Sequence, residues 1–252
     1  MNIDLSGENV LITGGTRGIG RVIATTLAQS GARVGAIYRT DNASAERTLG
    51  ELQRHGEGHF ILQADISVES ESVMATTEAG LRFGGAIDHL ILDAAAGAGG
   101  RMVDMTTEEW KRPFEVNVHG AFFVVRSITP MLRTGGSVVF LSSGAGHDPM
   151  EGLSAYGASK AAVNHLSGVL AQELGPMGIR VNVVSPGHTH KDDSDPNSDP
   201  SQYTDGQRSV VETTALRRLG TAQDVANVVL FYVSDLSRFV TGQWTRVNGG
   251  RI

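Results

Sequence analysis

The chain has no cysteine, no long apolar run and no excess of basic residues, and each absence excludes a class of protein. Without cysteine there is no disulfide framework, thiol nucleophile or thiolate metal site. The net charge of −6 argues against a nucleic-acid binder. No apolar stretch reaches the roughly 18 residues of a membrane span, and residues 1–7 lack the basic flank and apolar core of a signal peptide. We therefore expect a soluble, cytoplasmic protein that binds neither nucleic acid nor membrane.

Short apolar runs alternate regularly with helical segments along the chain. Its 252 residues suffice for one α/β domain with its own core, and neither an internal repeat nor a linker divides them. Strands separated by helices of this length indicate parallel crossover units. We expect one doubly wound (Rossmann-type) domain over residues 1–252, with a seven-stranded parallel sheet flanked by helices. The expected strands are 10–13, 33–38, 60–64, 89–94, 137–142, 180–185 and 244–248, and the expected helices are 19–30, 42–55, 70–83, 107–132, 155–175 and 223–234.

A glycine-rich turn follows the first apolar run. Residues 10–13 are typical of a buried parallel strand, and residues 21–30 read as a helix. Glycines between them let the backbone approach a pyrophosphate, whose charge the N–H groups of a helix N-terminus favour. The spacing Gly14-x-x-x-Gly18-x-Gly20 differs from the commoner G-x-G-x-x-G. Because a second strand follows, we interpret the segment as a mononucleotide-binding unit.

Tyr156 and Lys160 lie four residues apart in a run that reads as helix, so their side chains share one face. A phenol is normally a poor acid–base group at neutral pH, because its reference pKa is about 10. An ammonium one turn away favours the phenolate, so we expect Lys160 to lower the pKa of Tyr156. A pair at this spacing also occurs on solvated helices, so its meaning depends on the rest of the chain.

The glycine turn and the Tyr-x-x-x-Lys pair together resemble the short-chain dehydrogenase/reductase family, and the similarity covers nearly the whole chain. Much of this resemblance is to 3-oxoacyl-[acyl-carrier-protein] reductases and related ketoreductases, which share the motifs Tyr-Gly-Ala-Ser-Lys and, at the C-terminus, Val-Asn-Gly-Gly. Further motifs in the family's order are Asp65 after the third strand, Asn117 in Val-Asn-Val-His-Gly, Ser143 thirteen residues before Tyr156, Pro186-Gly187, and residues 240–250.

The resemblance implies hydride transfer between a nicotinamide and a carbonyl or alcohol carbon. It assigns catalysis to Asn117, Ser143, Tyr156 and Lys160. Tyr156 would protonate the substrate oxygen, which Ser143 would hold by a hydrogen bond. Lys160 would stabilise the phenolate and bond the nicotinamide ribose, and Asn117 would anchor a water that relays protons. The implied cofactor contacts are Gly14, Thr16, Arg17, Gly18, Ile19, Gly20, Arg39, Asp65 (at the adenine amino group), Ile66, Ala94, Tyr156, Lys160, Pro186, Gly187 and Thr189; no metal site is expected.

The charge at the end of the second strand favours NADPH as the cofactor. NAD-type sites place an acid there to hold the free ribose hydroxyls. This strand ends with Tyr38 and Arg39, and Arg17 in the glycine turn supplies a second cation. Two guanidinium groups suit a 2′-phosphate. We therefore expect NADPH, and with it reduction as the physiological direction.

Two positions depart from the family pattern. The fourth strand usually ends Asn-Asn-Ala-Gly, whereas this chain has Leu92 and Asp93 in place of the two amides. A carboxylate can replace an amide only as an acceptor, so the geometry there is in question. Lys191 stands where the family often has a threonine for the nicotinamide carboxamide, and we expect Thr189 to take that role.

The segment from His188 to about Gln207 breaks the alternation. It carries five aspartates and two prolines without sustained periodicity, so we expect it to be mobile without ligand. An acidic solvated loop is one interpretation. Because ligands in this fold bind beyond the carboxyl ends of the strands, we favour a substrate lid at about 188–215.

The substrate is less well defined than the reaction. In the family, an acidic carrier protein docks on cations that correspond to residues 131–136 and 175–179, where Arg133 is the one cation present. An acidic lid would also repel such a carrier. We therefore favour a free ketone as the substrate: a β-ketoacyl compound, a polyketide-like compound or another metabolite with a carbonyl group. A carrier-bound substrate is kept as an option.

Three other functions remain open at this point. Enoyl-thioester reduction is suggested by the turn at residues 94–97, although such reductases usually space Tyr and Lys more widely. A non-catalytic NADPH sensor would commonly lose Tyr or Lys, and a structural oligomer would need neither. The resemblance also implies a homodimer or homotetramer that pairs the helices near 107–132 and 155–175.

Overall fold

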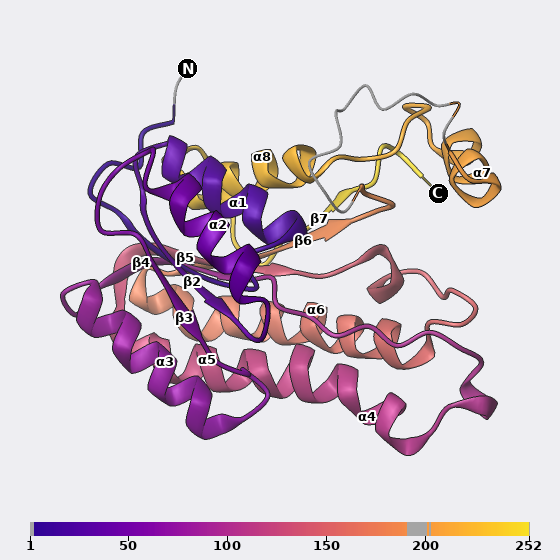
Figure 1. Cartoon of the computed structure of the whole chain (residues 1–252), viewed down its shortest axis with the longest axis horizontal. Helices are drawn as coiled ribbons and strands as arrows, with labels where there is room; N and C mark the ends of the chain where they lie inside the picture. Colours follow the sequence, from indigo (N-terminus) through magenta and orange to yellow (C-terminus); the bar gives the residue numbers. More distant parts are fainter. Residues whose placement is uncertain (1–2, 191–200, 202, 252) are drawn as a thin grey trace.

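The computed structural model describes residues 3–190, 201 and 203–251 (Figure 1). Its centre is a seven-stranded sheet in the order β3-β2-β1-β4-β5-β6-β7, and every pairing is parallel. This confirms the expected fold class. The strands are β1 (Asn9–Thr13), β2 (Arg33–Tyr38), β3 (Phe60–Gln63), β4 (Ile87–Leu92), β5 (Leu132–Leu141), β6 (Arg180–Pro186) and β7 (Trp244–Val247).

Helices cover both faces of the sheet (Figure 1). One face carries α1 (Gly18–Gln29), α2 (Asn42–Leu52) and α8 (Ala222–Val233), and the other carries α3 (Glu69–Arg82), α4 (Thr107–Phe114), α5 (Ala121–Ile128) and α6 (Ser154–Leu174). Because side chains alternate along a strand, β1 supplies both cores. Val10 and Ile12 pack toward Ile23 of α1, whereas Leu11 packs in the core that contains Val163 of α6.

The region expected as one helix over 107–132 is interrupted, and that expectation was wrong. A turn of π-helix (Glu115–Gly120) separates α4 from α5, and a turn of 3-10 helix (Thr129–Met131) follows. Pro113 lies inside α4 and has no N–H to donate to the preceding turn. Such π-turns concentrate at functional sites. Other 3-10 turns are Met102–Asp104, Gly144–Gly146, Gly175–Met177 and Asp235–Ser237.

Strand β5 begins five residues earlier than expected, at Leu132 instead of residue 137. Ile87 pairs with Leu132 but His89 pairs with Ser137, so the register shifts between these two pairs. The sequence pattern missed the first half of the strand because residues 133–135 are exposed and include two polar side chains and a glycine.

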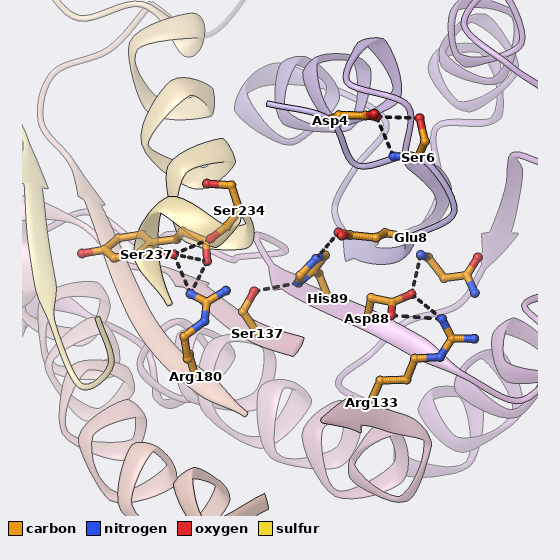
Figure 2. A network of polar contacts seen from close by, with 12 residues as sticks. Asp4, Ser6, Glu8, Asp88, His89, Arg133, Ser137, Arg180, Ser234 and Ser237 are labelled. Carbon is orange, nitrogen blue, oxygen red and sulfur yellow. Dashed lines mark hydrogen bonds and ion pairs between the residues drawn. The ribbon is translucent and has the colours of Figure 1, made fainter. Parts of the chain in front are cut away.

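The amino-terminal ends of the central strands are joined by polar pairs that are buried or partly buried (Figure 2). His89 contacts Ser137 Oγ through Nδ1 at 2.9 Å and Glu8 Oε2 through Nε2 at 2.7 Å. Arg180 Nη1 donates to Ser237 Oγ at 2.6 Å. The Ser–His–Glu chain resembles a hydrolytic triad in connectivity, but Ser137 has no exposed surface and cannot reach a substrate. We therefore interpret this edge of the sheet as structural.

Much of the segment interpreted as a lid, residues 191–200 and 202, lies outside the described residues, as does Lys191. The part that is described contains α7 (Asp205–Thr213), which begins with a capping box between Thr204 and Gln207. A helix therefore starts before the end of the segment in which no periodicity was expected. In Figure 1, α7 lies past the carboxyl end of β6, and its role as part of a lid remains a prediction.

No helix in the described part of the chain is both long and apolar enough to cross a bilayer.

Candidate active site

The residues expected to act on substrate meet at the carboxyl ends of the central strands. Ser143 lies two residues after the end of β5, whereas Tyr156 and Lys160 lie in the first turns of α6. Asn117 enters from the π-turn, which packs against α6. Parallel strands bring their carboxyl ends to one edge of the sheet, which is where ligands bind in doubly wound folds.

Tyr156 and Ser143 form the centre of this group. The Ser143 hydroxyl lies close enough to the Tyr156 phenol to lower its pKa. Ser143 Oγ accepts a hydrogen bond from the Ala145 N–H at 3.2 Å, which fixes the Ser143 hydroxyl at the start of the turn between β5 and α6. The two hydroxyl groups thus lie near each other, where one substrate oxygen could contact both.

Lys160 is buried behind Tyr156, with 3% of its surface exposed. Its Nζ donates to the Leu141 carbonyl oxygen at 2.7 Å and lies 5.9 Å from the centroid of the Tyr156 ring. Burial lowers the pKa of Lys160 to about 8, although the negative charge of Asp93 opposes this shift. The ammonium is therefore still the main form at neutral pH.

The pKa of Tyr156 is raised in the protein as described, whereas a net lowering was expected. Burial raises the pKa of the phenol, the nearby Ser143 hydroxyl lowers it, and the charge of Asp93 raises it further. Burial dominates because it disfavours the phenolate. The Lys160 ammonium is engaged by the Leu141 carbonyl and faces the charge of Asp93.

Asn117 connects the π-turn to two other parts of the site. Its Oδ1 accepts from the Ala96 N–H at 2.8 Å, and its Nδ2 donates to the Ala96 carbonyl at 3.0 Å and to Ser159 Oγ at 2.9 Å. A cavity of about 10 Å³ lies between Asn117 and Lys160. This is close to the smallest volume that holds one water.

The glycine turn packs so closely within the protein that side chains on Gly14 or Gly20 would clash with neighbouring backbone. Gly14 has a φ of +73°, and a Cβ there would lie 2.8 Å from the Ala94 nitrogen. A Cβ on Gly20 would lie 2.3 Å from the Gly14 oxygen. Among the described residues, Arg17, the N-cap of α1, makes no side-chain hydrogen bond to the first turn. The first N–H groups of α1 can therefore receive a pyrophosphate, so the turn fits a dinucleotide.

Asp93 lies directly behind this turn. Its carboxylate lies against Gly20, because a Cβ on Gly20 would come within 2.5 Å of Asp93 Oδ2. The residue as a whole retains some exposure, but its carboxylate is directed inward. Burial raises the pKa of Asp93 to about 7, against the opposing charges of Lys160 and Arg17. The replacement of an amide by a carboxylate thus puts a titratable group between the turn and Lys160.

Asp65, expected at the adenine amino group, is already paired with arginine. Its Oδ2 lies 3.2 Å from Arg112 Nη2 and 3.8 Å from Arg39 Nη1, and Ser67 donates to its Oδ1. Burial raises the pKa of Asp65, but the hydrogen bonds with Ser67 and Arg112 outweigh it, so the pKa lies below its ordinary value. Sequence reasoning missed Arg112, which belongs to no motif and is 47 residues away from Asp65.

A cavity of about 660 Å³ opens beside Arg112, between α4 and the loop at residues 97–99. It adjoins the Asp65 end of the site and does not include Tyr156. Volume alone would therefore place the site one loop away from the acid–base residues. We place the candidate reactive centre at the Tyr156 group, because those are the side chains expected to carry out acid–base chemistry.

The remaining expected contacts lie along the same edge. Ile66 is buried, Thr16 is buried in the glycine turn, and the Ala94 N–H donates to Thr13 Oγ1 at 3.2 Å. Beyond β6, Thr189 Oγ1 donates to the Gly187 carbonyl at 3.2 Å. The contacts of these residues with a cofactor remain predictions. The residues whose positions are consistent with such contacts are Gly14, Thr16, Arg17, Gly18, Ile19, Gly20, Ile66, Ala94, Pro186, Gly187 and Thr189.

Known proteins are similar to this chain over nearly its whole length. The family model described as enoyl-(acyl carrier protein) reductase matches residues 14–251. The short-chain dehydrogenase/reductase AacuN of Aspergillus aculeatus is 34% identical, covering 98% of this chain and 96% of the relative. The 3-oxoacyl-[acyl-carrier-protein] reductase FabG of Staphylococcus epidermidis is also 34% identical, covering 96% of this chain and 98% of the relative.

Solved structures agree with the sequence comparison. A dehydrogenase/reductase from Sinorhizobium meliloti has 31% identity and a TM-score of 0.89, covering 99% of this chain and 97% of the other. A short-chain dehydrogenase from Burkholderia cenocepacia in complex with NADP has 33% identity and a TM-score of 0.89, covering 98% of each chain. The fold, the arrangement of Tyr156, Lys160 and Ser143 beside the glycine turn, and these relatives show that the chain belongs to the short-chain dehydrogenase/reductase family of oxidoreductases.

Proposed function

We propose that this protein reduces a ketone to a secondary alcohol, with NADPH as its cofactor and Tyr156 as the proton donor. The observation that carries the proposal is the grouping of Tyr156 with the nearby Ser143 hydroxyl and the buried Lys160, whose Nζ lies 5.9 Å from the Tyr156 ring centroid, beside a glycine turn that fits a dinucleotide. The bound nicotinamide supplies the hydride. The protein supplies the orientation of the carbonyl and the proton.

The protonation states support the reductive direction. Because burial raises the pKa of Tyr156, the phenol keeps its proton at neutral pH and can donate it to an oxygen that gains charge. Ser143 holds that oxygen by a second hydrogen bond, which strengthens as charge develops. The Lys160 ammonium, 5.9 Å from the ring centroid, then stabilises the phenolate. A water in the small cavity beside Asn117 would return a proton along Lys160.

Two arginines support NADPH over NADH. Arg39 follows β2, where NAD-type sites have an acid, and its side chain is 53% exposed, so the guanidinium is accessible to a ligand. Arg17 is the N-cap of α1. Arg39 lies 3.8 Å from Asp65, a separation at which an ion pair is weak, so a 2′-phosphate can compete for it. The Burkholderia cenocepacia neighbour was solved with NADP.

A free ketone is favoured over a carrier-bound one. Arg133, the one cation in the two segments where a carrier would dock, forms an ion pair with Asp88 at 3.2 Å (Figure 2). This pairing reduces the positive charge that an acidic carrier protein could contact. Relatives named as 3-oxoacyl-[acyl-carrier-protein] reductases keep β-ketoacyl thioesters among the substrates to test.

We also propose a homo-oligomer that buries α5 and α6. Phe122 on α5 is 47% exposed and Val169 on α6 is 40% exposed. Large apolar side chains at this exposure on neighbouring helices suit an interface with a second copy. Light scattering after size-exclusion chromatography, with Phe122→Glu as the disrupting variant, tests this.

The function is tested by fluorescence titration with NADPH and NADH, then by NADPH oxidation with β-keto thioesters, quinones, polycyclic ketones and α,β-unsaturated thioesters. Tight NADPH binding with turnover of any ketone supports the proposal. Turnover of the unsaturated thioesters alone would instead support enoyl reduction, the reaction in the name of the matching family model. Binding without turnover in every arm would favour a dinucleotide sensor.

A further inference from the structure

Asp93 is a carboxylate at the positive end of α1 that comes from another part of the chain. It follows β4, and its backbone N–H donates to the Thr13 carbonyl at 3.3 Å. From there the carboxylate reaches Gly20 in the first turn of α1, where a Cβ on Gly20 would come within 2.5 Å of Asp93 Oδ2. A helix N-terminus favours negative charge within this first turn. Asp93 therefore contacts the N-terminus of α1 from the protein interior, whereas a pyrophosphate would approach the same helix end from the ligand side.

The charged and titratable groups that face Asp93 come from two elements. Lys160 and Tyr156 belong to α6, and Arg17 belongs to the glycine turn. Both cations are expected to contact the dinucleotide when it binds: Lys160 would bond the ribose hydroxyls, and Arg17 would bond a phosphate. The bound dinucleotide would bring further negative charge to the other side of the turn. A carboxylate beside like charge, with its counter-ions engaged elsewhere, is driven to its neutral form.

We propose that dinucleotide binding is coupled to protonation of Asp93, so that the carboxylate behind the glycine turn takes up one proton from solvent as the pyrophosphate binds in front of it. This rests on the dinucleotide site of the proposed function and is independent of the substrate. In the free protein the pKa of Asp93, about 7, leaves it largely ionised at mildly alkaline pH, so a proton can be taken up there.

The coupling would also prepare the reactive centre. The negative charge of Asp93 raises the pKa of Tyr156. Neutralising Asp93 removes that contribution, so Tyr156 gives up its proton more readily once the dinucleotide is in place. Asp93 thus acts as a positioning residue, since it acts through Gly20, Lys160 and Tyr156 without contacting the substrate.

The test is calorimetric titration of the whole protein with ADP-ribose and NADH at about pH 8, in buffers of different ionisation enthalpy. Both ligands lack a 2′-phosphate, so the titration of that group cannot contribute. We expect the wild type to take up about one proton per site, and its Kd to rise by up to about tenfold per pH unit above neutrality. Asp93→Asn keeps the size of the side chain and an oxygen beside Gly20 but cannot take up a proton, so it should show almost no uptake and a flat Kd.

Asp4→Asn is the matched control, because it removes an exposed carboxylate at the opposite edge of the sheet (Figure 2). It should behave as the wild type. Equal uptake in Asp93→Asn and the wild type, or no uptake in the wild type, would overturn the proposal.

A second measurement does not depend on the variant. In wild-type protein labelled with ¹³C at aspartate carboxyls, one resonance should titrate near neutral pH and move to higher pH when ADP-ribose is added. Absence of such a carboxyl overturns the proposal. Nucleotide binding with proton uptake but no ketone turnover would support this inference while the proposed reduction fails, and no nucleotide binding at any pH would overturn both.

Discussion

Asn117 Nδ2 donates a hydrogen bond to Ser159 Oγ at 2.9 Å, and this bond joins the π-turn to the helix that carries Tyr156. Ser159 Oγ in turn donates to the Tyr156 carbonyl at 2.7 Å. Both side chains are buried, so the bond is shielded from water. The position of Tyr156 therefore depends on a residue 42 positions away from Ser159.

Ser159→Ala should lower the free energy of unfolding by about 1–2 kcal/mol, because a buried amide N–H loses one of its acceptors. We also expect a lower kcat, since the first turns of α6 are no longer tied to the π-turn. Ser167→Ala is the matched control: Ser167 is equally buried in α6 and makes the same type of bond, to the Asn164 carbonyl at 2.7 Å. Urea unfolding and steady-state kinetics measure both effects. Equal kcat values in the two variants would show that the link has no effect on catalysis.

Tyr156→Phe removes the proposed proton donor and leaves the ring and its packing in place. We expect kcat for ketone reduction to fall by about 10²–10⁴-fold, the usual contribution of a positioned acid. NADPH affinity, measured by fluorescence titration, should change little because the glycine turn is untouched. Retained turnover would show that another group supplies the proton, and loss of NADPH binding would indicate a structural role for the hydroxyl.

Arg39→Asp should shift cofactor preference toward NADH. The change removes a charge-assisted contact to the 2′-phosphate, worth about 1.5–3 kcal/mol, and places an acid where ribose hydroxyls would lie. Asp65 retains Arg112 at 3.2 Å, so the local fold should persist. The ratio of NADPH to NADH Kd values is the readout. Arg17→Gln serves as the comparison, and a ratio moved only by Arg17→Gln would place the phosphate at the glycine turn.

His59 should make the protein sensitive to acid. Its Nδ1 accepts the Val34 N–H at 3.0 Å, and burial, followed by the charges of His55 and Arg33, lowers its pKa below 6.5. A histidine whose pKa is lower in the folded state than in the unfolded state stabilises the fold when the pH is above the unfolded-state pKa. This stabilisation is lost as the pH falls through the folded-state pKa. The free energy of unfolding should therefore fall as the pH drops below 6.5.

Urea unfolding of wild type, His59→Asn and His55→Asn at several pH values between about 5 and 8 measures this dependence. His59→Asn should flatten it, whereas His55→Asn, an exposed neighbour, should leave most of it in place. The idea fails if His59→Asn keeps the wild-type pH dependence.

The fold and the pair of Tyr156 and Lys160 could be predicted because their signals are local, whereas Ser143 was identified through the family resemblance. Apolar runs and glycine positions define the strand–turn–helix units, and four-residue spacing places Tyr156 and Lys160 on one helix face. The π-turn at Glu115–Gly120 could not be predicted in the same way. Its residues continue a helical pattern, and it is the contacts of Asn117 with Ala96 and Ser159 that distinguish it.

The sequence by itself determined a parallel doubly wound sheet and predicted a dinucleotide turn and an acid–base pair, because each follows from residue types at short, fixed spacings. The tertiary structure alone decided the pairing of Arg112 with Asp65, the direction in which burial shifts the pKa of Tyr156, and the placement of Asp93 behind Gly20. These depend on distances between residues far apart in the chain and on exclusion of water. Charge and desolvation act through space, so no pattern along the chain specifies them.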